Sequence, residues 1–364
     1  MVIPISKPSI GKEEIDAVVS VLRSGNLVQG EKVREFEIDF SRYVGAKFGV
    51  AVSSGTAALQ IGLQALGLKK GDEVITTPFS FASTANAVLH CEAKPVFADI
   101  DPRTFNIDPV KIKECLTERT KAVICVHLYG QPCEMDQIVK TCRYAGAELI
   151  EDAAQAVGAE YKGKKVGGFS RLSAFSFYAT KNITTGEGGM ILTGSEELAE
   201  KASIMRNQGQ SRPYRHEIIS YNFRMTDMQA SIGIEQLKKV EALNSKRIEN
   251  AGFLTDSLSG LEGIQIPFVQ KGVKHVFHQY TIKVEKNRDR LLEYLNHHGI
   301  GAKVYYPEPI YRQPPYERMG FRKGCCPLAE EASEKVLSLP VHPLLTEKDL
   351  DKIVKTVRDG LSSA

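Results

Sequence analysis

The sequence predicts an α/β fold with a mostly parallel, seven-stranded sheet covered by helices, followed by a smaller α+β region. The main observation is that short apolar runs rich in valine, isoleucine and phenylalanine alternate with helical stretches between residues 48 and 193. Continuous apolar runs separated by helices are typical of parallel strands that are buried on both faces. The seven runs are Phe48–Val52, Glu73–Thr76, Pro95–Ala98, Ala122–Val126, Leu149–Glu151, Ala174–Phe177 and Met190–Thr193.

The rest of the chain predicts a second region near the C-terminus. An amphipathic pattern over Glu13–Leu22 predicts a helix before the sheet, and Met225–Leu258 predicts one long helix or a kinked pair. We therefore divide the chain into a large domain, residues 1–245, and a small C-terminal domain, residues 246–364. The elements expected after the long helix are a strand at Gln279–Val284, a helix at Arg288–His297, a strand at Ala302–Tyr306 and a helix at Glu347–Leu361.

The composition is that of an ordinary globular protein. The chain has 364 residues, of which 42% are hydrophobic and 25% charged. Its net charge of +3 is too small to argue for a nucleic-acid or membrane partner. No apolar run approaches the ~20 residues that span a bilayer. The N-terminus also lacks the basic segment and apolar core of a signal peptide. These features predict a cytoplasmic protein.

The cysteines and histidines do not predict a metal site. The seven cysteines are an odd number scattered over a long chain, which indicates reduced thiols. No pair has the Cys-x-x-Cys spacing of a zinc site, and Cys325 and Cys326 are simply adjacent. His297 and His298 are neighbours in a predicted helix, where consecutive side chains diverge by roughly 100°.

Lys181 stands in the most informative stretch of the sequence. It follows the run Ala174–Phe177 by four residues, and the loop Thr184-Thr-Gly-Glu-Gly-Gly follows soon after it. Glycines let the backbone turn and approach a bound group closely. A lysine in this setting can lose its solvation and become the nucleophilic amine that Schiff-base chemistry requires. Taken alone, however, Lys181 would be read as a solvated surface lysine.

Asp152 ends a predicted buried strand and is followed by small residues. In open α/β sheets, ligands lie at the carboxyl ends of the strands. The residues after Asp152 are too small to block a flat ring, and a pyridoxal ring needs a carboxylate beside its ring nitrogen. The alternative role for Asp152 is a helix N-cap, which does not exclude the first.

Gly55 and Thr56 open a helical pattern directly after the first predicted strand. The N-terminus of a helix binds phosphate through its free N–H groups and its dipole. A Ser-Gly-Thr turn is more often an ordinary N-cap, so this signal is weak by itself. Together, the three segments supply a phosphate anchor, a partner for a ring nitrogen and a lysine.

These motifs, in this order, resemble the DegT/DnrJ/StrS family of sugar aminotransferases, which depend on pyridoxal phosphate and have the aspartate aminotransferase fold (fold type I). The resemblance covers nearly the whole chain. The matching segments are Pro8-Ser-Ile-Gly, Glu35-Phe-Glu, Ser54-Gly-Thr-Ala-Ala, Thr77-Pro-Phe-Ser-Phe-Ala-Ser-Thr, Glu151-Asp-Ala-Ala-Gln-Ala, Thr180-Lys-Asn-Ile-Thr-Thr-Gly-Glu-Gly-Gly, Tyr221-Asn-Phe-Arg-Met-Thr and Leu337-Ser-Leu-Pro.

The resemblance implies specific roles around the cofactor. Lys181 and Asp152 would be the catalytic pair. Phe81 would stack on the cofactor ring, and Gln155 would contact the ring oxygen. Ser176 would bind the phosphate together with Gly55 and Thr56. Strand alternation agrees, because it puts Ala174 and Ser176 on one face.

More distant residues are assigned in the same way. In the family, the residue matching Asn222 reaches the phosphate of the neighbouring subunit, so the resemblance implies a homodimer with shared active sites. Arg224 would lie near the anionic part of a substrate, although a structural ion pair is an equal alternative. Tyr305, Tyr306 and Tyr311 lie in a segment that resembles a sugar-binding one, where histidines are common at positions 305 and 311. Plain packing is equally compatible with these tyrosines.

The function implied is transfer of an amino group, from L-glutamate as donor, to a nucleotide-linked keto sugar. Three alternatives remain open: a keto-inositol (cyclitol) acceptor, a dehydratase or lyase of the same fold, and a regulatory protein. Lys181 argues against the dehydratases, because those family members carry histidine there. A regulator of transcription would need a basic stripe or helix-turn-helix pattern, which the sequence lacks.

Overall fold

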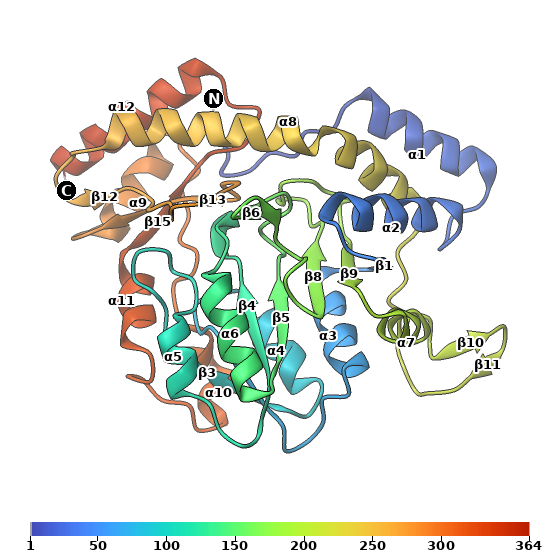
Figure 1. Cartoon of the computed structure of the whole chain (residues 1–364). Helices are drawn as coiled ribbons and strands as arrows, with labels where there is room; N and C mark the ends of the chain where they lie inside the picture. Colours follow the sequence, from blue (N-terminus) through green and yellow to red (C-terminus); the bar gives the residue numbers. More distant parts are fainter. Residues whose placement is uncertain (1, 364) are drawn as a thin grey trace.

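The computed structural model describes residues 2–363 and is built around one seven-stranded sheet (Figure 1). Strands β1 and β8 both pair with β9 in antiparallel fashion, and every other neighbouring pair is parallel. The predicted mostly parallel sheet is therefore confirmed. In spatial order the strands are β1 (Phe48–Val52), β9 (Gly189–Thr193), β8 (Leu172–Ser176), β5 (Glu148–Asp152), β4 (Thr120–Val126), β2 (Glu73–Thr76) and β3 (Lys94–Phe97).

Helices cover both faces of this sheet, as the apolar runs predict. Successive residues of a strand point to opposite faces, and the core divides accordingly. Ile124 and Ala174 belong to a cluster that packs against one set of helices, while Val123 and Phe175 face the other set. The helices of the large region are α1 (Lys12–Ser24), α2 (Glu31–Val44), α3 (Gly55–Ala65), α4 (Ser83–Leu89), α5 (Pro109–Glu114), η1 (Leu128–Gly130), α6 (Met135–Ala145) and α7 (Glu196–Arg206).

Helix α8 (Asp227–Leu258) runs unbroken across the top of the molecule in Figure 1. Its first part packs with the large sheet through Val240. Its last two turns enter a separate core with Leu254 and Leu258. Ile3 joins this second core, and its backbone pairs with Gly299 and Gly301. The change of packing partner occurs near residue 245, but the division into two domains stays a prediction.

The second core is an antiparallel sheet covered by helices. The expected strand at Ala302–Tyr306 is wrong, because only Lys303 pairs with Ser338, as an isolated bridge. Strand pairing ends there since the next residues turn toward the large sheet, where the Tyr129 hydroxyl donates to the Tyr305 carbonyl. The elements are β12 (Ile264–Gln265), β14 (Tyr280–Val284), β15 (Val336–Leu339), α9 (Arg288–His297), η2 (Ile310–Arg312), α10 (Pro314–Arg318), α11 (Pro327–Lys335) and α12 (Glu347–Ser363).

Two small sheets complete the structure. One joins β13 (Val273–Lys274) to β6 (Glu160–Tyr161) and β7 (Lys164–Lys165), and so ties the two regions together. The other is the hairpin of β10 (Gln210–Arg212) and β11 (Arg215–His216), which projects from the body of the molecule (Figure 1). None of the helices in the described part of the chain is long and apolar enough to cross a membrane.

Candidate active site

Three segments meet at the carboxyl edge of the large sheet, and each one brings a residue that the sequence singled out. Asp152 is the last residue of β5, and it pairs in register with Ala174 of β8. Ser176 ends β8, and Lys181 follows in the connecting loop, where its N–H donates to the Tyr178 carbonyl. Gly55 begins α3 shortly after β1 ends. The edge is therefore a place where phosphate, ring and amine groups can converge.

Asp152 is a buried carboxylate with a small set of donors. Its side chain accepts a hydrogen bond from the Thr84 hydroxyl at 2.9 Å and one from the Ala154 N–H at 3.2 Å. Burial raises the pKa of Asp152, while these two bonds and the charge of Lys181 act to lower it. A buried carboxylate in this state is stabilised by any cation placed beside it. A protonated ring nitrogen is such a cation.

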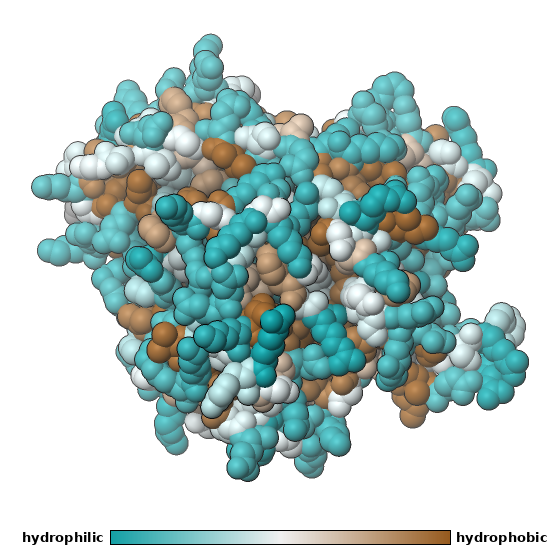
Figure 2. All heavy atoms as spheres, in the orientation of Figure 1, coloured by the Kyte–Doolittle hydropathy of each residue, from teal (hydrophilic) through white to brown (hydrophobic). Residues whose placement is uncertain are grey.

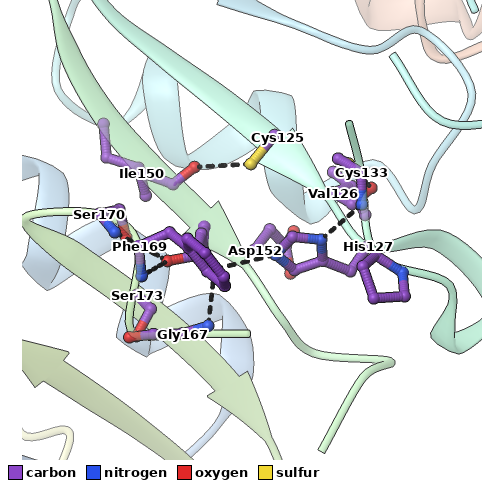
Figure 3. Close-up of polar contacts among 12 residues, drawn as sticks. Cys125, Val126, His127, Cys133, Ile150, Asp152, Gly167, Phe169, Ser170 and Ser173 are labelled. Carbon is purple, nitrogen blue, oxygen red and sulfur yellow. Dashed lines mark hydrogen bonds and ion pairs between the residues drawn. The ribbon is translucent and has the colours of Figure 1, made fainter. Parts of the chain in front are cut away.

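A hydrogen-bonded layer lies behind Asp152 and fixes the end of β5 (Figure 3). Glu151 accepts bonds from the N–H groups of Gly167 and Ser170 and from the Ser170 hydroxyl, at 2.6 to 2.9 Å. His127 Nε2 lies 3.1 Å from Glu151, and His127 Nδ1 accepts from the Cys133 N–H at 3.1 Å. Because Nδ1 is an acceptor, Nε2 carries the proton that is donated to Glu151. The backbone N–H of His127 also donates to the Asp152 carbonyl at 3.1 Å, so these bonds fix the backbone at the end of β5.

Lys181 has the environment of a nucleophilic amine. Burial lowers its pKa to about 8, against the opposing charge of Asp152. An amine with this pKa is neutral in an appreciable fraction of molecules at neutral pH, whereas an ordinary lysine is not. The expectation of a desolvated lysine at position 181 therefore agrees with its lowered pKa.

The turn at Gly55 is packed so closely that only glycine fits. A Cβ atom on Gly55 would lie 2.7 Å from the Ser176 Cβ, so the α3 N-terminus and the Ser176 side chain face one another. Gly189, from the glycine loop, would meet the Ser54 carbonyl oxygen at 2.3 Å. The N–H groups of Gly55 and Thr56 are the first two of α3 and point out of its N-terminus. These groups form a cradle that suits a phosphate.

Aromatic and amide side chains border the space next to Asp152. The Phe81 side chain is 63% exposed, and its ring centroid lies 6.4 Å from that of Tyr306. Gln155 donates to the Tyr306 hydroxyl at 3.0 Å and accepts from the Tyr129 N–H at 2.7 Å. Burial raises the pKa of Tyr306. Phe81 thus offers an open ring face, while Gln155 and Tyr306 hold one another in place.

The other two tyrosines are placed differently. Tyr305 is half-buried beside Tyr306, with its carbonyl bonded to Tyr129. Tyr311 is fully buried, packs on Phe97, and donates to Glu330 at 2.7 Å. The structure therefore brings Tyr305 and Tyr306 to the site but gives Tyr311 a packing position without exposed surface.

Asn222 and Arg224 lie on the chain that passes the end of β1. Arg224 pairs with Val52 by its backbone, and its guanidinium donates to Asn207 at 2.8 Å. Asn222 pairs with Asn207 by its backbone and leaves its side chain exposed. Neither side chain contacts Lys181 or Asp152 of its own chain.

Sequence reasoning missed four residues at this site: Thr84, His127, Tyr129 and His278. Thr84 lies three residues after Phe81, which is one helical turn, so its position beside the ring could have been inferred. His278 is 6% exposed, and burial together with the charge of Lys181 lowers its pKa. It belongs to the second region, more than 90 residues from Lys181, and no local pattern joins the two.

The desolvated lysine, the buried carboxylate and the phosphate cradle define a pyridoxal phosphate-dependent transferase of fold type I. The sequence profile of the DegT/DnrJ/EryC1/StrS aminotransferase family matches residues 8–358, and the chain belongs to this family. GDP-perosamine synthase of Caulobacter vibrioides is 38% identical, over 97% of this chain and 96% of its own. A UDP-N-acetyl-3-dehydro-alpha-D-glucosamine 3-aminotransferase of Acidithiobacillus ferrooxidans is 38% identical, over 96% and 94%.

Solved structures agree with the family assignment. PseC of Helicobacter pylori, an aminotransferase involved in the biosynthesis of pseudoaminic acid, is 33% identical, with a TM-score of 0.95 over all of both chains. DesV of Streptomyces venezuelae is 35% identical, with a TM-score of 0.93 over 95% of this chain and 94% of its own. The protein is accordingly a pyridoxal phosphate-dependent aminotransferase.

Proposed function

We propose that the protein transfers an amino group from an amino-acid donor to a keto sugar linked to a nucleotide. The observation that carries this proposal is that Lys181, whose pKa is lowered to about 8, and the buried Asp152 lie at the same carboxyl edge of the sheet and act on one another by their charges. Relatives that are named for GDP-, UDP- and dTDP-linked sugars support the acceptor class. L-Glutamate is the proposed donor.

The residues divide the chemical work between them. Bound pyridoxal phosphate supplies an electron sink that stabilises negative charge at the carbon losing its proton. With the cofactor bound, Gly55, Thr56 and Ser176 would hold its phosphate, and Asp152 would keep its ring nitrogen protonated. Lys181 would bind the cofactor through its amine and would move the proton at the donor Cα. Phe81 and Gln155 would fix the ring plane.

The experiment that tests this function is a panel of donors and acceptors. Purified protein with added cofactor is incubated with L-glutamate and with GDP-, UDP- and dTDP-linked 3-keto and 4-keto sugars, and amino-sugar formation is followed by mass spectrometry. A keto-inositol is included as the rival acceptor. Amination of the inositol alone would overturn the nucleotide-sugar assignment, and a dehydrated product without nitrogen would overturn the transaminase assignment.

A second experiment locates the cofactor on the chain. Borohydride reduction followed by peptide mapping should find the cofactor fixed covalently to Lys181. This result follows from the low pKa of its amine and its closeness to Asp152. Attachment to another lysine, or failure to take up cofactor, would contradict the site.

We also propose a homodimer whose active sites are shared. The Asn222 side chain is exposed, so a neighbouring subunit can contact it. Apolar side chains are exposed on α1, α2 and beside the β10–β11 hairpin, which stands out from the body in Figure 2. They include Ile15, Leu22, Ile38, Tyr214 and Ile219.

Mixing two inactive variants tests the shared site. If Lys181 of one subunit acts with Asn222 of the other, a heterodimer of Lys181→Ala and Asn222→Ala chains has one intact site and one doubly defective site. Activity should then return partly on subunit exchange. Absence of recovery after verified exchange would place both residues in one subunit's site.

The cytoplasm is the proposed location. The seven cysteines are all unpaired, and Cys325 is exposed. Exposed free thiols are typical of reducing compartments.

A further inference from the structure

A polar stripe on the buried face of α8 leads away from Lys181. Asn244, Arg247 and Asn250 are spaced three residues apart, so they lie on one side of the helix. Their exposed fractions are 0%, 3% and 0%. The stripe begins next to the lysine, because Asn182 donates to Asn244 Oδ1 at 2.8 Å. Arg247 follows about 4.5 Å further along the helix axis.

Arg247 is a buried cation without an anionic partner. Burial lowers its pKa only to about 10, so it stays charged at neutral pH. Within residues 2–363 no aspartate or glutamate forms an ion pair with it, and its Nε makes no hydrogen bond. Among the described residues its one hydrogen bond is to the Phe277 carbonyl, and this bond is long at 3.4 Å. By contrast, the buried Arg206 pairs with Glu37 and donates to the Ala51 carbonyl at 2.7 Å.

The groups around Arg247 do not neutralise it. Burial and the charge of Arg247 lower the pKa values of His278 and His342, so both rings are neutral at neutral pH. His278 Nδ1 and both His342 ring nitrogens are buried without a well-formed hydrogen bond, although the Pro4 backbone lies near His342. Lys7 and Asp349 also act on His342, with opposite signs. A buried charge normally has a partner, and an uncompensated one is costly.

The stripe reaches the reaction centre through a second connection. His278 follows Phe277, whose carbonyl accepts from Arg247, and the charges of Lys181 and Arg247 both act on the His278 ring. The backbone of His278 lies 3.0 Å from the position of a Cβ on Gly130, which also approaches the Gln155 carbonyl. Arg247 is therefore linked through Phe277 and His278 to the backbone beside Gln155 and to the residues that act on Lys181.

From this geometry we infer that Arg247, with His278, forms the subsite for the side-chain carboxylate of a dicarboxylic amino donor. The inference rests on the proposed function. Arg224 is another arginine that no carboxylate of the described residues pairs with, and it lies two residues after Asn222, on the segment proposed above to reach the neighbouring subunit's site. Two unpaired arginines match the two carboxylates of such a donor: Arg224 serves the carboxylate on the reacting carbon, and Arg247 serves the distal one.

The first test uses the unaltered holoenzyme and compares L-glutamate with L-glutamine, which has the same length but a neutral amide. Conversion of the cofactor by each donor is followed by its absorption, without any sugar. Glutamate should be favoured roughly tenfold or more in kcat/KM, the effect of one charge-assisted hydrogen bond. Equal use of both donors would overturn this inference and leave the aminotransferase function intact. No conversion by any amino donor would instead overturn the function itself.

The second test removes the charge. Arg247→Met should abolish the preference for glutamate through KM and leave the KM of the sugar unchanged, and Arg247→Lys should keep part of the preference. Lys246→Met is the matched control, because Lys246 is the neighbouring cation on α8 and pairs with Glu249 at the surface. Retention of full selectivity by Arg247→Met would contradict the subsite.

Calorimetry on the holoenzyme supplies a readout that does not depend on turnover. Glutarate should bind more tightly than its mono-amide, glutaramate, and Arg247→Lys should narrow the difference. This measurement remains decisive if Arg247→Met does not fold, since equal binding of the two probes to the unaltered protein would also refute the inference.

Discussion

Glu151 and Asp152 are neighbours on β5, both buried, yet their environments differ. Burial acts to raise the pKa of each carboxyl group. On the Glu151 side, bonds from His127, Gly167 and Ser170 outweigh burial, and the pKa is lowered. On the Asp152 side two hydrogen bonds and the charges of Lys181 and His127 oppose burial, but burial outweighs them and the pKa is raised. A buried carboxylate with many hydrogen-bond donors stabilises the fold, whereas one with few donors can still stabilise a cationic group of a bound ligand.

The alternation of side chains along a strand explains how β5 carries one carboxylate that stabilises the fold and one that faces the site. Adjacent residues of a strand point to opposite faces, so Glu151 turns toward the loop at 167–170 and Asp152 turns toward Thr84 and Lys181. Changes on the Asp152 side should reduce activity with little effect on folding. Changes on the Glu151 side should reduce the stability of the fold with little direct effect on activity.

The largest effect is expected from Lys181→Ala. Turnover should fall by about a thousandfold, because a positioned general acid–base group contributes about a hundred- to ten-thousandfold. The variant should still fold and bind cofactor noncovalently, since the phosphate and ring contacts come from other residues. Steady-state kinetics measures the turnover, and circular dichroism measures the folding. Substantial remaining turnover would show that another group does the work.

Glu151→Gln tests the opposite side. Loss of the charge that several donors face should lower the free energy of unfolding by about 3 kcal/mol, measured by urea denaturation. Glu148→Gln is the control on the same strand, where the carboxylate forms a partly exposed pair with Arg171. If Glu151→Gln and Glu148→Gln lose similar amounts of free energy of unfolding, the buried donors around Glu151 do not contribute to stability.

The pH dependence of stability should show the same contrast. Because the folded pKa of Glu151 is lowered, its contribution is present above the unfolded value of 4.5 and is lost as pH falls through the folded pKa. Glu151→Gln should therefore flatten the acid limb of the stability curve. In cofactor-free protein Asp152→Asn should have the opposite sign and increase stability at neutral pH, since the raised pKa marks a destabilised charge.

The amine on the Asp152 side should titrate near pH 8. Only neutral Lys181 can attack the cofactor aldehyde, so the rate of cofactor uptake should rise about tenfold between pH 7 and a plateau above pH 9. Stopped-flow absorbance of cofactor-free protein measures this rate. A midpoint above pH 10 would indicate that the lysine is solvated, in conflict with its burial.

Local patterns predicted the sheet, because each strand is encoded in a few consecutive residues. The structure brings Lys181, Asp152 and Gly55 to one edge of that sheet, and their roles stay predictions. The strand expected at Ala302–Tyr306 failed because its alternation reflects contacts with the site, including the Tyr129 bond to Tyr305, instead of a neighbouring strand. Tyr311 could not be placed for a similar reason: its partner Glu330 lies in α11, and no local pattern joins the two.

The smallest effect is expected from Thr84→Val, which removes the hydroxyl that donates to Asp152. This bond lowers the pKa of Asp152, so its loss should raise that pKa further and leave less carboxylate to meet the ring nitrogen. A bond to a charged group contributes about 1.5 kcal/mol, and cofactor affinity should fall roughly tenfold. Thr84→Ser, which keeps the hydroxyl, should retain most of the affinity. If Thr84→Val and Thr84→Ser bind cofactor equally well, the Thr84 hydroxyl does not help to position the Asp152 carboxylate. The two carboxylates would then differ only in the number of donors that Glu151 has.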